Sequence, residues 1–268
     1  MGQIRKLVLG AALALAPAAT AYGADLGLPP PPPEPCPGCA GPWYLKGFVG
    51  AANPQVGGLD YELFGPNFQF FDKDIKSTPL FGIGFGYDTG HYFRFDITGE
   101  YRGKAVFLAH DRYSNNGVFT PPAGGTNEYT ADIESWVGLF NTYIDLGTWY
   151  CVTPYVGGGV GFASLSVFGY KDVNVPNNGV AFGSDNTETN FAWAVYGGLA
   201  YQVTPSLTLD LAYRYTDLGD AKTGRTFAYD NSTVAGPFTI EDITSHDVML
   251  SVRWALGSPP APMPVAFK

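Results

Sequence analysis

The sequence predicts an all-β protein, an eight-stranded antiparallel up-and-down transmembrane β-barrel. The 268-residue chain is 15% aromatic and only 15% charged, which is unusual for a domain whose whole surface faces water. Runs of about ten residues alternate between apolar and polar or small side chains, the period of a strand with two unlike faces. The segments between these runs are alternately short and long, as in a barrel with tight turns at one end and loops at the other.

Residues 1–23 have the pattern of a secretory signal peptide. Arg5 and Lys6 precede the apolar run Leu7–Ala16, and small residues follow it. The run is shorter than the roughly 20 apolar residues that a membrane helix needs. Cleavage after Ala21 or after Gly23 fits the small-residue rule, and the sequence leaves both open. Loss of the two cations moves the net charge from −9 to −11, so we expect no nucleic acid partner.

Residues 24–42 are predicted to form a proline-rich periplasmic spacer. Proline fixes φ and lacks an amide donor, which favours an extended polyproline II chain over helix or strand. The spacer holds Cys36 and Cys39. In an exported chain this pair is a candidate for a small structural disulfide, and Cys151, in a predicted turn, is either an odd partner or a free thiol.

Eight alternating runs are predicted to form the barrel within residues 43–256, followed by a C-terminal extension at 257–268. The predicted strands are Trp43–Ala51, Leu80–Tyr87, Tyr92–Arg102, Thr130–Leu146, Pro154–Tyr170, Asn190–Val203, Leu207–Thr216 and Ser245–Ala255. The predicted long loops are Ala52–Pro79, Gly103–Tyr129, Lys171–Thr189 and Asp217–Thr244. All four fall at one end, and short turns join the strands at the other, periplasmic end.

One face of most predicted strands is apolar and the other is polar, charged or glycine-rich. A water-soluble barrel would turn the apolar face inward. The aromatic residues near both strand ends instead favour a membrane barrel with two aromatic girdles. The inner girdle is Trp43, Tyr87, Phe93, Tyr201 and Trp254, and the outer one is Phe81, Tyr101, Trp193, Tyr213 and Tyr215. The facing of Thr130–Leu146 stays open, because Trp136 and Phe140 lie on one phase and Val137 and Leu139 on the other.

Four sequence patterns point to a family: the Ala24-Asp25 start, WYLKGFVGA from Trp43, the segment Asn141–Ala163, and YRYTDLGD from Tyr213. They resemble the small outer-membrane β-barrel proteins of alphaproteobacteria, which are similar to the OmpA transmembrane domain and to opacity-type surface proteins. The resemblance implies the outer membrane of a Gram-negative bacterium, with membrane lipid and lipopolysaccharide as partners. It also implies that a mature chain starting at Ala24 is linked to peptidoglycan through the spacer, as in some family members. The added C-terminal extension departs from the family, whose chains usually end on an aromatic residue.

The inward face predicts a lumen filled by side chains, since eight strands leave no room for a wide channel. Buried charges are costly unless they are paired, so we expect a charge network with hydrogen bonds to Thr98, Tyr155, Tyr196 and Gln202. An alternative is a narrow channel through shifting pairs. The predicted network is Lys46, Arg94, Asp96, Glu100, Arg102, Asp210, Arg214, Asp247 and Arg253.

These features predict a non-enzymatic barrel with structural and surface-interaction roles, as a monomer or weak oligomer. The four predicted loops carry a net charge of −7 and show no dense ligand pattern, so we expect no metal and no cofactor. A lipid A-modifying enzyme is a second alternative. Its best nucleophile and base, in Ser245-His246-Asp247, are neighbours on a strand and point to opposite faces, so no catalytic residue is assigned.

Overall fold

The structure, a computed structural model, describes residues 41–257 apart from 66, 115–116 and 118–123. The predicted signal peptide at 1–23 lies outside the described residues. So do the predicted spacer, except for its last two residues, and the C-terminal extension from residue 258 onward.

Within the described residues the chain forms ten strands and one short 3₁₀ helix, η1 (Val175–Asn177). None of the described helical structure is long and apolar enough to cross a membrane. The strands are β1 (Trp43–Asp60), β2 (Gln69–Ile75), β3 (Thr78–Asp88), β4 (Phe93–Ser114), β5 (Gly124–Asp145), β6 (Val152–Asn174), β7 (Gly179–Gly183), β8 (Asn186–Gln202), β9 (Leu207–Ala228) and β10 (Val234–Leu256).

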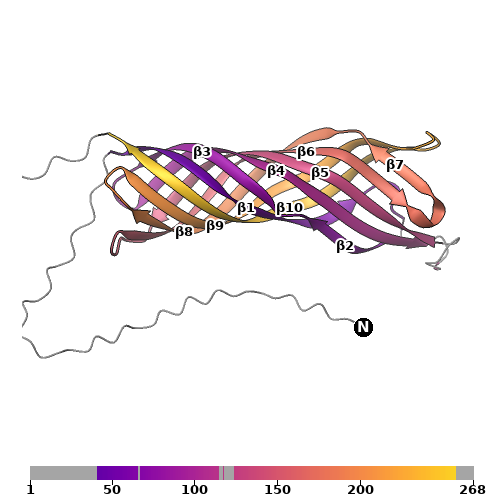
Figure 1. The fold of residues 1–268 in the computed structure, drawn as a ribbon, viewed down its shortest axis with the longest axis horizontal. Coiled ribbons are helices and arrows are strands. Elements are labelled where there is room, and N and C mark those ends of the chain that lie inside the picture. The colour runs from indigo at the N-terminus through magenta and orange to yellow at the C-terminus, as the bar shows by residue number, and fades with distance from the viewer. Residues whose placement is uncertain (1–40, 66, 115–116, 118–123, 258–268) are drawn as a thin grey trace, which may run out of the picture. The chain divides into compact units, whose positions relative to one another are not determined.

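Eight of these strands pair in a closed antiparallel ring (Figure 1). β1 pairs with both β10 and β3, and the pairing continues through β4, β5, β6, β8 and β9 back to β10. The count of ten differs from the predicted eight, because β2 pairs with β4 and β7 lies between β6 and β9. Both extra strands fall in segments that were predicted as loops.

The prediction of long structureless loops is wrong, because the strands of the ring continue into them. β4 runs to Ser114 instead of ending at Arg102, and β10 begins at Val234 instead of Ser245. A register shift between Arg102 and Ala105 changes which alternate residues of β4 point inward. Such a bulge interrupts the alternation of inward and outward side chains along the strand. In the sequence this interruption looks like the end of a strand.

The change of phase separates two parts of the barrel. We call the part between the short turns and the level of Arg102, Ser135 and Ser245 the inner half, and everything beyond this level the outer half. The inner half exposes large apolar side chains on its outside and buries charges within; examples of the exposed side chains are Leu45, Ile83, Ile97, Leu211 and Leu250. The outer half buries apolar and aromatic side chains instead; examples are Ile75, Phe107, Tyr129, Leu165, Phe238 and Ile240.

The sequence left open which face of β5 points into the lumen. In the structure Trp136 and Phe140 point outward in the inner half, like the exposed apolar side chains of the other strands. Trp136 and Phe140 are 61% and 49% exposed on the outside of the inner half, whereas Val137 and Leu139 are buried in the lumen. The lumen of the inner half therefore contains apolar side chains beside its charges.

Glycines on the inward face of β3 leave room for two large rings. A Cβ at Gly82 would overlap the ring of Phe48, and one at Gly86 would overlap Tyr44. The rings of Phe48 and Tyr44 on β1 thus lie directly over the glycines of the neighbouring strand, where a larger residue would not fit.

Candidate functional site in the barrel lumen

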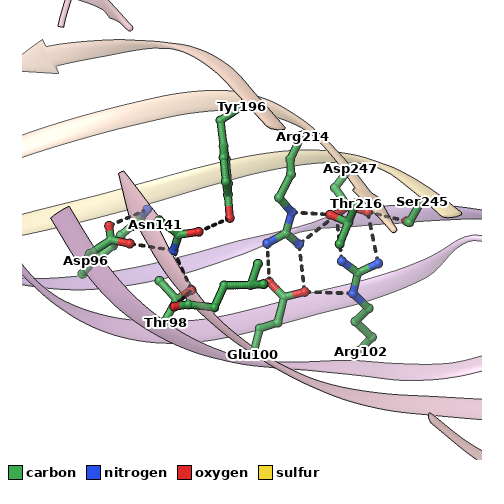
Figure 2. A network of polar contacts seen from close by, with 12 residues as sticks. Asp96, Thr98, Glu100, Arg102, Asn141, Tyr196, Arg214, Thr216, Ser245 and Asp247 are labelled. Atoms are coloured by element: carbon green, nitrogen blue, oxygen red, sulfur yellow. Dashed lines mark hydrogen bonds and ion pairs between the residues drawn. The ribbon is translucent and has the colours of Figure 1, made fainter. Parts of the chain in front are cut away.

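Four charged residues form a square across the outer part of the charged lumen (Figure 2). Arg102 of β4 donates to Glu100 at 2.8 Å and to Asp247 of β10 at 2.9 Å. Arg214 of β9 donates to the same two carboxylates, each at 2.8 Å. All four side chains are at most 2% exposed. The square therefore ties β4 to β9 and β10 through the interior.

Hydroxyl groups complete the coordination of Asp247. Ser245 donates to one carboxylate oxygen at 2.5 Å, and Thr216 donates to the other at 3.3 Å. A buried carboxylate with two guanidinium and two hydroxyl donors has most of its lone pairs occupied, as a charge in a low dielectric needs.

A second cluster lies closer to the short turns than the square does, and it is centred on Asp96 of β4. Its carboxylate accepts from Lys46 at 3.3 Å, Asn141 at 2.7 Å, Tyr44 at 3.2 Å and Tyr143 at 3.3 Å. The Asn141 amide joins three strands, because it also donates to Thr98 at 3.0 Å and accepts from Tyr196 at 2.8 Å.

Two further ion pairs lie at the inner mouth. Arg94 forms a bidentate pair with Asp145, and Arg253 forms one with Asp210, all with distances of 2.8–3.1 Å. The Arg94 guanidinium also lies 4.8 Å from the centre of the Tyr155 ring. A cavity of about 210 Å³ opens beside these pairs at the end of the barrel that carries the short turns.

All nine charged residues predicted for the lumen are inward-facing and at most 9% exposed. Sequence reasoning missed Asp145, whose strand had no assigned facing, and with it the lumen contains five acids for its five cations. It also missed Tyr44, Asn141 and Tyr143, although each of them is one of the alternate residues of its strand that point into the lumen. Of the four expected hydrogen-bonding residues, Thr98 and Tyr196 bond to Asn141, Tyr155 lies against Arg94, and Gln202 is part-buried at the inner mouth.

The ten residues of the two predicted girdles lie on the outside of the inner half. Trp43 stacks on Phe85 at the inner end, with ring centres 5.1 Å apart. At the outer end Tyr101 contacts both Phe81 and Trp136, with ring centres 5.4 and 4.9 Å apart. Phe85 and Trp136 extend the girdles beyond the predicted residues.

Ser245, His246 and Asp247, the residues considered for enzyme chemistry, do not assemble into a catalytic set, and the two other histidines lie apart from them. Ser245 and Asp247 point into the lumen, whereas His246 is exposed on the outside and contacts Tyr213. His91 is exposed at a short turn, and His110 is on the outside of the outer half, 3.5 Å from Asp72. No group of three His, Cys, Asp or Glu that could hold a metal converges in the described part of the chain.

Cys151 is disulfide-bonded, so it is not the free thiol that the sequence left open. Cys36 and Cys39 lie outside the described residues. The expected bridge between Cys36 and Cys39 therefore stays a prediction.

A family model for the outer membrane protein beta-barrel domain matches residues 38–237. The chain belongs to this family. The outer membrane protein beta-barrel family places it in the outer membrane of a Gram-negative bacterium, and the apolar exterior of the inner half is accordingly its lipid-facing surface.

Relatives of this family member include an uncharacterized protein of Brucella abortus, which is 27% identical over 213 residues and covers 73% of each chain. The outer membrane protein PagN of Salmonella typhimurium is 30% identical over 122 residues, 44% of this chain and 48% of PagN. Among solved structures, Neisserial surface protein A matches 80% of this chain and 97% of its own, with 20% identity and a TM-score of 0.41.

Proposed function

We propose that this chain is a non-enzymatic outer-membrane barrel with a closed lumen, which stabilises the envelope and presents a surface for interactions. The observation that carries the proposal is the square of Glu100, Arg102, Arg214 and Asp247. Its bonds cross the lumen from β4 to β9 and β10 and leave each charge paired. An ion passing this level would have to displace a buried pair, which costs several kcal/mol.

The apolar interior of the outer half supports the same conclusion. Directly beyond the square lie Ile133, Leu165, Leu218 and Ile243, all buried. The void between these side chains and Arg102 is about 20 Å³, enough for roughly one water molecule. A hydrated ion would meet an apolar layer immediately after the charged one.

Planar-bilayer recording of the refolded barrel tests the proposal. We expect no steady conductance from the native chain once heat-modifiability on a gel shows that it is folded. Asp247→Asn removes a carboxylate shared by two arginines and should give transient openings. The matched variant Asp132→Asn removes a carboxylate on the outside of the outer half, 3.9 Å from Lys104, and should stay silent. A stable unitary conductance of the native chain would favour the narrow-channel alternative.

We also propose that the outer half supplies the interaction surface. Its strands extend beyond the lipid-facing belt, and the segments read as loops from the sequence carry a net charge of −7. Divalent cations that bridge lipopolysaccharide would join this surface to the surrounding membrane. Removal of divalent cations from native membranes should then weaken co-purification of lipopolysaccharide with the barrel, and unchanged co-purification would contradict this role.

Attachment to peptidoglycan through the spacer remains a separate proposal, since the spacer lies outside the described residues. Muropeptide digestion should release a fragment linked to Ala24 if the attachment exists. Digestion that releases only unmodified muropeptides would eliminate it without affecting the closed-barrel proposal.

A further inference from the structure

A cavity opens at the outer end of the barrel, far from the charged square. Its volume is about 360 Å³, within the range of small-molecule sites. Tyr61, Asn127, Asp172 and Asn174 line it, and they also line an adjoining hollow of about 210 Å³ walled by Phe64, Phe68, Tyr113 and Tyr129. We call the two hollows together the outer cavity.

Two carboxylates lie at this cavity without a basic partner. Asp172 of β6 is in its wall, and Asp111 of β4 lies behind it, fully buried, accepting from Asn127 at 3.0 Å and Tyr129 at 2.7 Å. Among the described residues, no Lys, Arg or His forms an ion pair with either acid. Five cations balance five acids in the inner lumen, so the uncompensated charge here is a local departure from that pattern.

Two buried polar atoms beside these acids lack a hydrogen-bond partner within the described residues. They are the Asp172 Oδ1 and the hydroxyl of Tyr170, a side chain that is 2% exposed. Burial, and then the charges of Asp172 and Asp111, raise the pKa of the Tyr170 hydroxyl. Buried polar atoms in native structures are nearly always satisfied by protein, water or a ligand.

The residues that line the outer cavity indicate which class of ligand it could bind. A divalent metal would need more oxygen ligands than two carboxylates, and no metal-binding group of three acids, histidines or cysteines occurs among the described residues. Aromatic rings attract poorly hydrated organic cations through their π faces. Tyr61 supplies such a ring beside Asp172, and Tyr113 and Tyr129 extend the aromatic wall.

We propose that the outer cavity binds a small organic cation of the ammonium class, with Asp172 as its counter-ion and Tyr61 as its aromatic wall. The cation supplies the positive charge that the described protein does not. This site goes beyond the closed-barrel proposal and does not depend on it, because the outer cavity lies on the far side of the apolar layer.

Titration of the full-length mature chain in nanodiscs with choline chloride tests the proposal by ligand-observed NMR and calorimetry. The neutral isostere 3,3-dimethylbutan-1-ol serves as the ligand control. We expect choline to bind and the isostere to bind at least about tenfold more weakly, since a charge-assisted contact is worth at least about 1.4 kcal/mol. Equal binding of the two probes, or no choline binding, would overturn the proposal.

A matched pair of variants locates the site. Asp172→Asn keeps the shape of the side chain and should weaken choline at least about tenfold. Asp60→Asn removes the same charge from an exposed position at the same end of the barrel and should change affinity less than about twofold. An affinity for choline that is unchanged by Asp172→Asn would overturn the assignment. So would calcium chloride binding in a manner dependent on Asp172 while choline does not bind.

The pH dependence provides a test that needs no variant. Burial and the charge of Asp111 raise the pKa of Asp172 to about 7. The titratable groups that interact with it are Asp111 of β4, Tyr129 of β5, Tyr170 of β6, and Tyr61 in the cavity wall. Choline affinity should therefore rise about 30-fold from pH 5.5 to pH 8.5 as Asp172 loses its proton. A flat profile would contradict its role as the counter-ion.

Discussion

The inner and outer halves of the barrel are built on the same strands but bury opposite kinds of side chain. In the inner half Arg102, Arg214 and Asp247 are inside and apolar residues are outside. In the outer half Phe107 and Phe238 are inside. β4 contributes to both patterns and changes phase at one bulge.

The difference shows that the surrounding solvent, and not the strand, decides which face is buried. Lipid gives no hydrophobic gain for turning apolar side chains inward, and it cannot solvate a charge. Charges in the inner half can therefore be kept only inside, where they pair with one another. Beyond the lipid the exterior meets water, and burial of apolar area again stabilises the fold, by about 25 cal/mol per Å².

The outer half should depend on its apolar core as a soluble protein does. Phe238 is fully buried and its ring centre lies within 4.9–6.1 Å of those of Tyr170, Tyr129, Tyr61 and Phe107. Phe238→Ala should destabilise the outer half by about 3–5 kcal/mol, measured by hydrogen exchange of its amides. The inner half should keep its protection and its heat-modifiable gel shift.

An exposed ring of the outer half provides the control. Phe71 is 65% exposed, and Phe71→Ala should change stability by less than about 0.5 kcal/mol. Similar costs for Phe71→Ala and Phe238→Ala, or loss of protection in both halves together, would mean that the outer half has no core of its own.

A pair of substitutions on one strand tests where the lipid ends. Ile97 and Val106 are both exposed on β4, at 64% and 42%, on either side of the bulge. Ile97→Arg puts a charge into hydrocarbon and should cost about 2–4 kcal/mol, measured by urea unfolding in lipid vesicles. Val106→Arg should cost less than about 0.5 kcal/mol, because its surroundings are aqueous. Equal costs would place both positions in the same solvent.

The two halves also differ in how far the sequence alone predicts them. In the inner half, Arg94, Asp96 and Glu100 alternate with Phe93, Phe95 and Ile97 without interruption, so both faces could be assigned. In the outer half the bulge beyond Arg102 reverses the phase and the exterior becomes polar. A sequence pattern that requires apolar residues on the outward face therefore predicts that the strand ends at the bulge.

The partners within the lumen were only partly predictable, for a related reason. Asp145 of β5 pairs with Arg94 of β4. This pair depends on the register between the two strands, which the local sequence of neither strand determines. The uncompensated acids of the outer half were equally hidden, because Asp111 and Asp172 lay in segments read as loops. Whether a charge is buried depends on packing between strands far apart in sequence.

The smallest expected effect comes from the acid of the outer half that has no basic partner. Asp172 has a pKa of about 7 in the fold, raised from 3.8 by burial and by Asp111. The folded chain therefore holds a proton that the unfolded chain releases, and stability is greatest below pH 4 and falls as the pH rises to about 7. The stability of the outer half should drop by about 2–3 kcal/mol between pH 5 and pH 8, measured by hydrogen exchange. Asp172→Asn should flatten this dependence, since an amide does not titrate. A rise in outer-half stability with pH would show that a cation within the protein already neutralises Asp172.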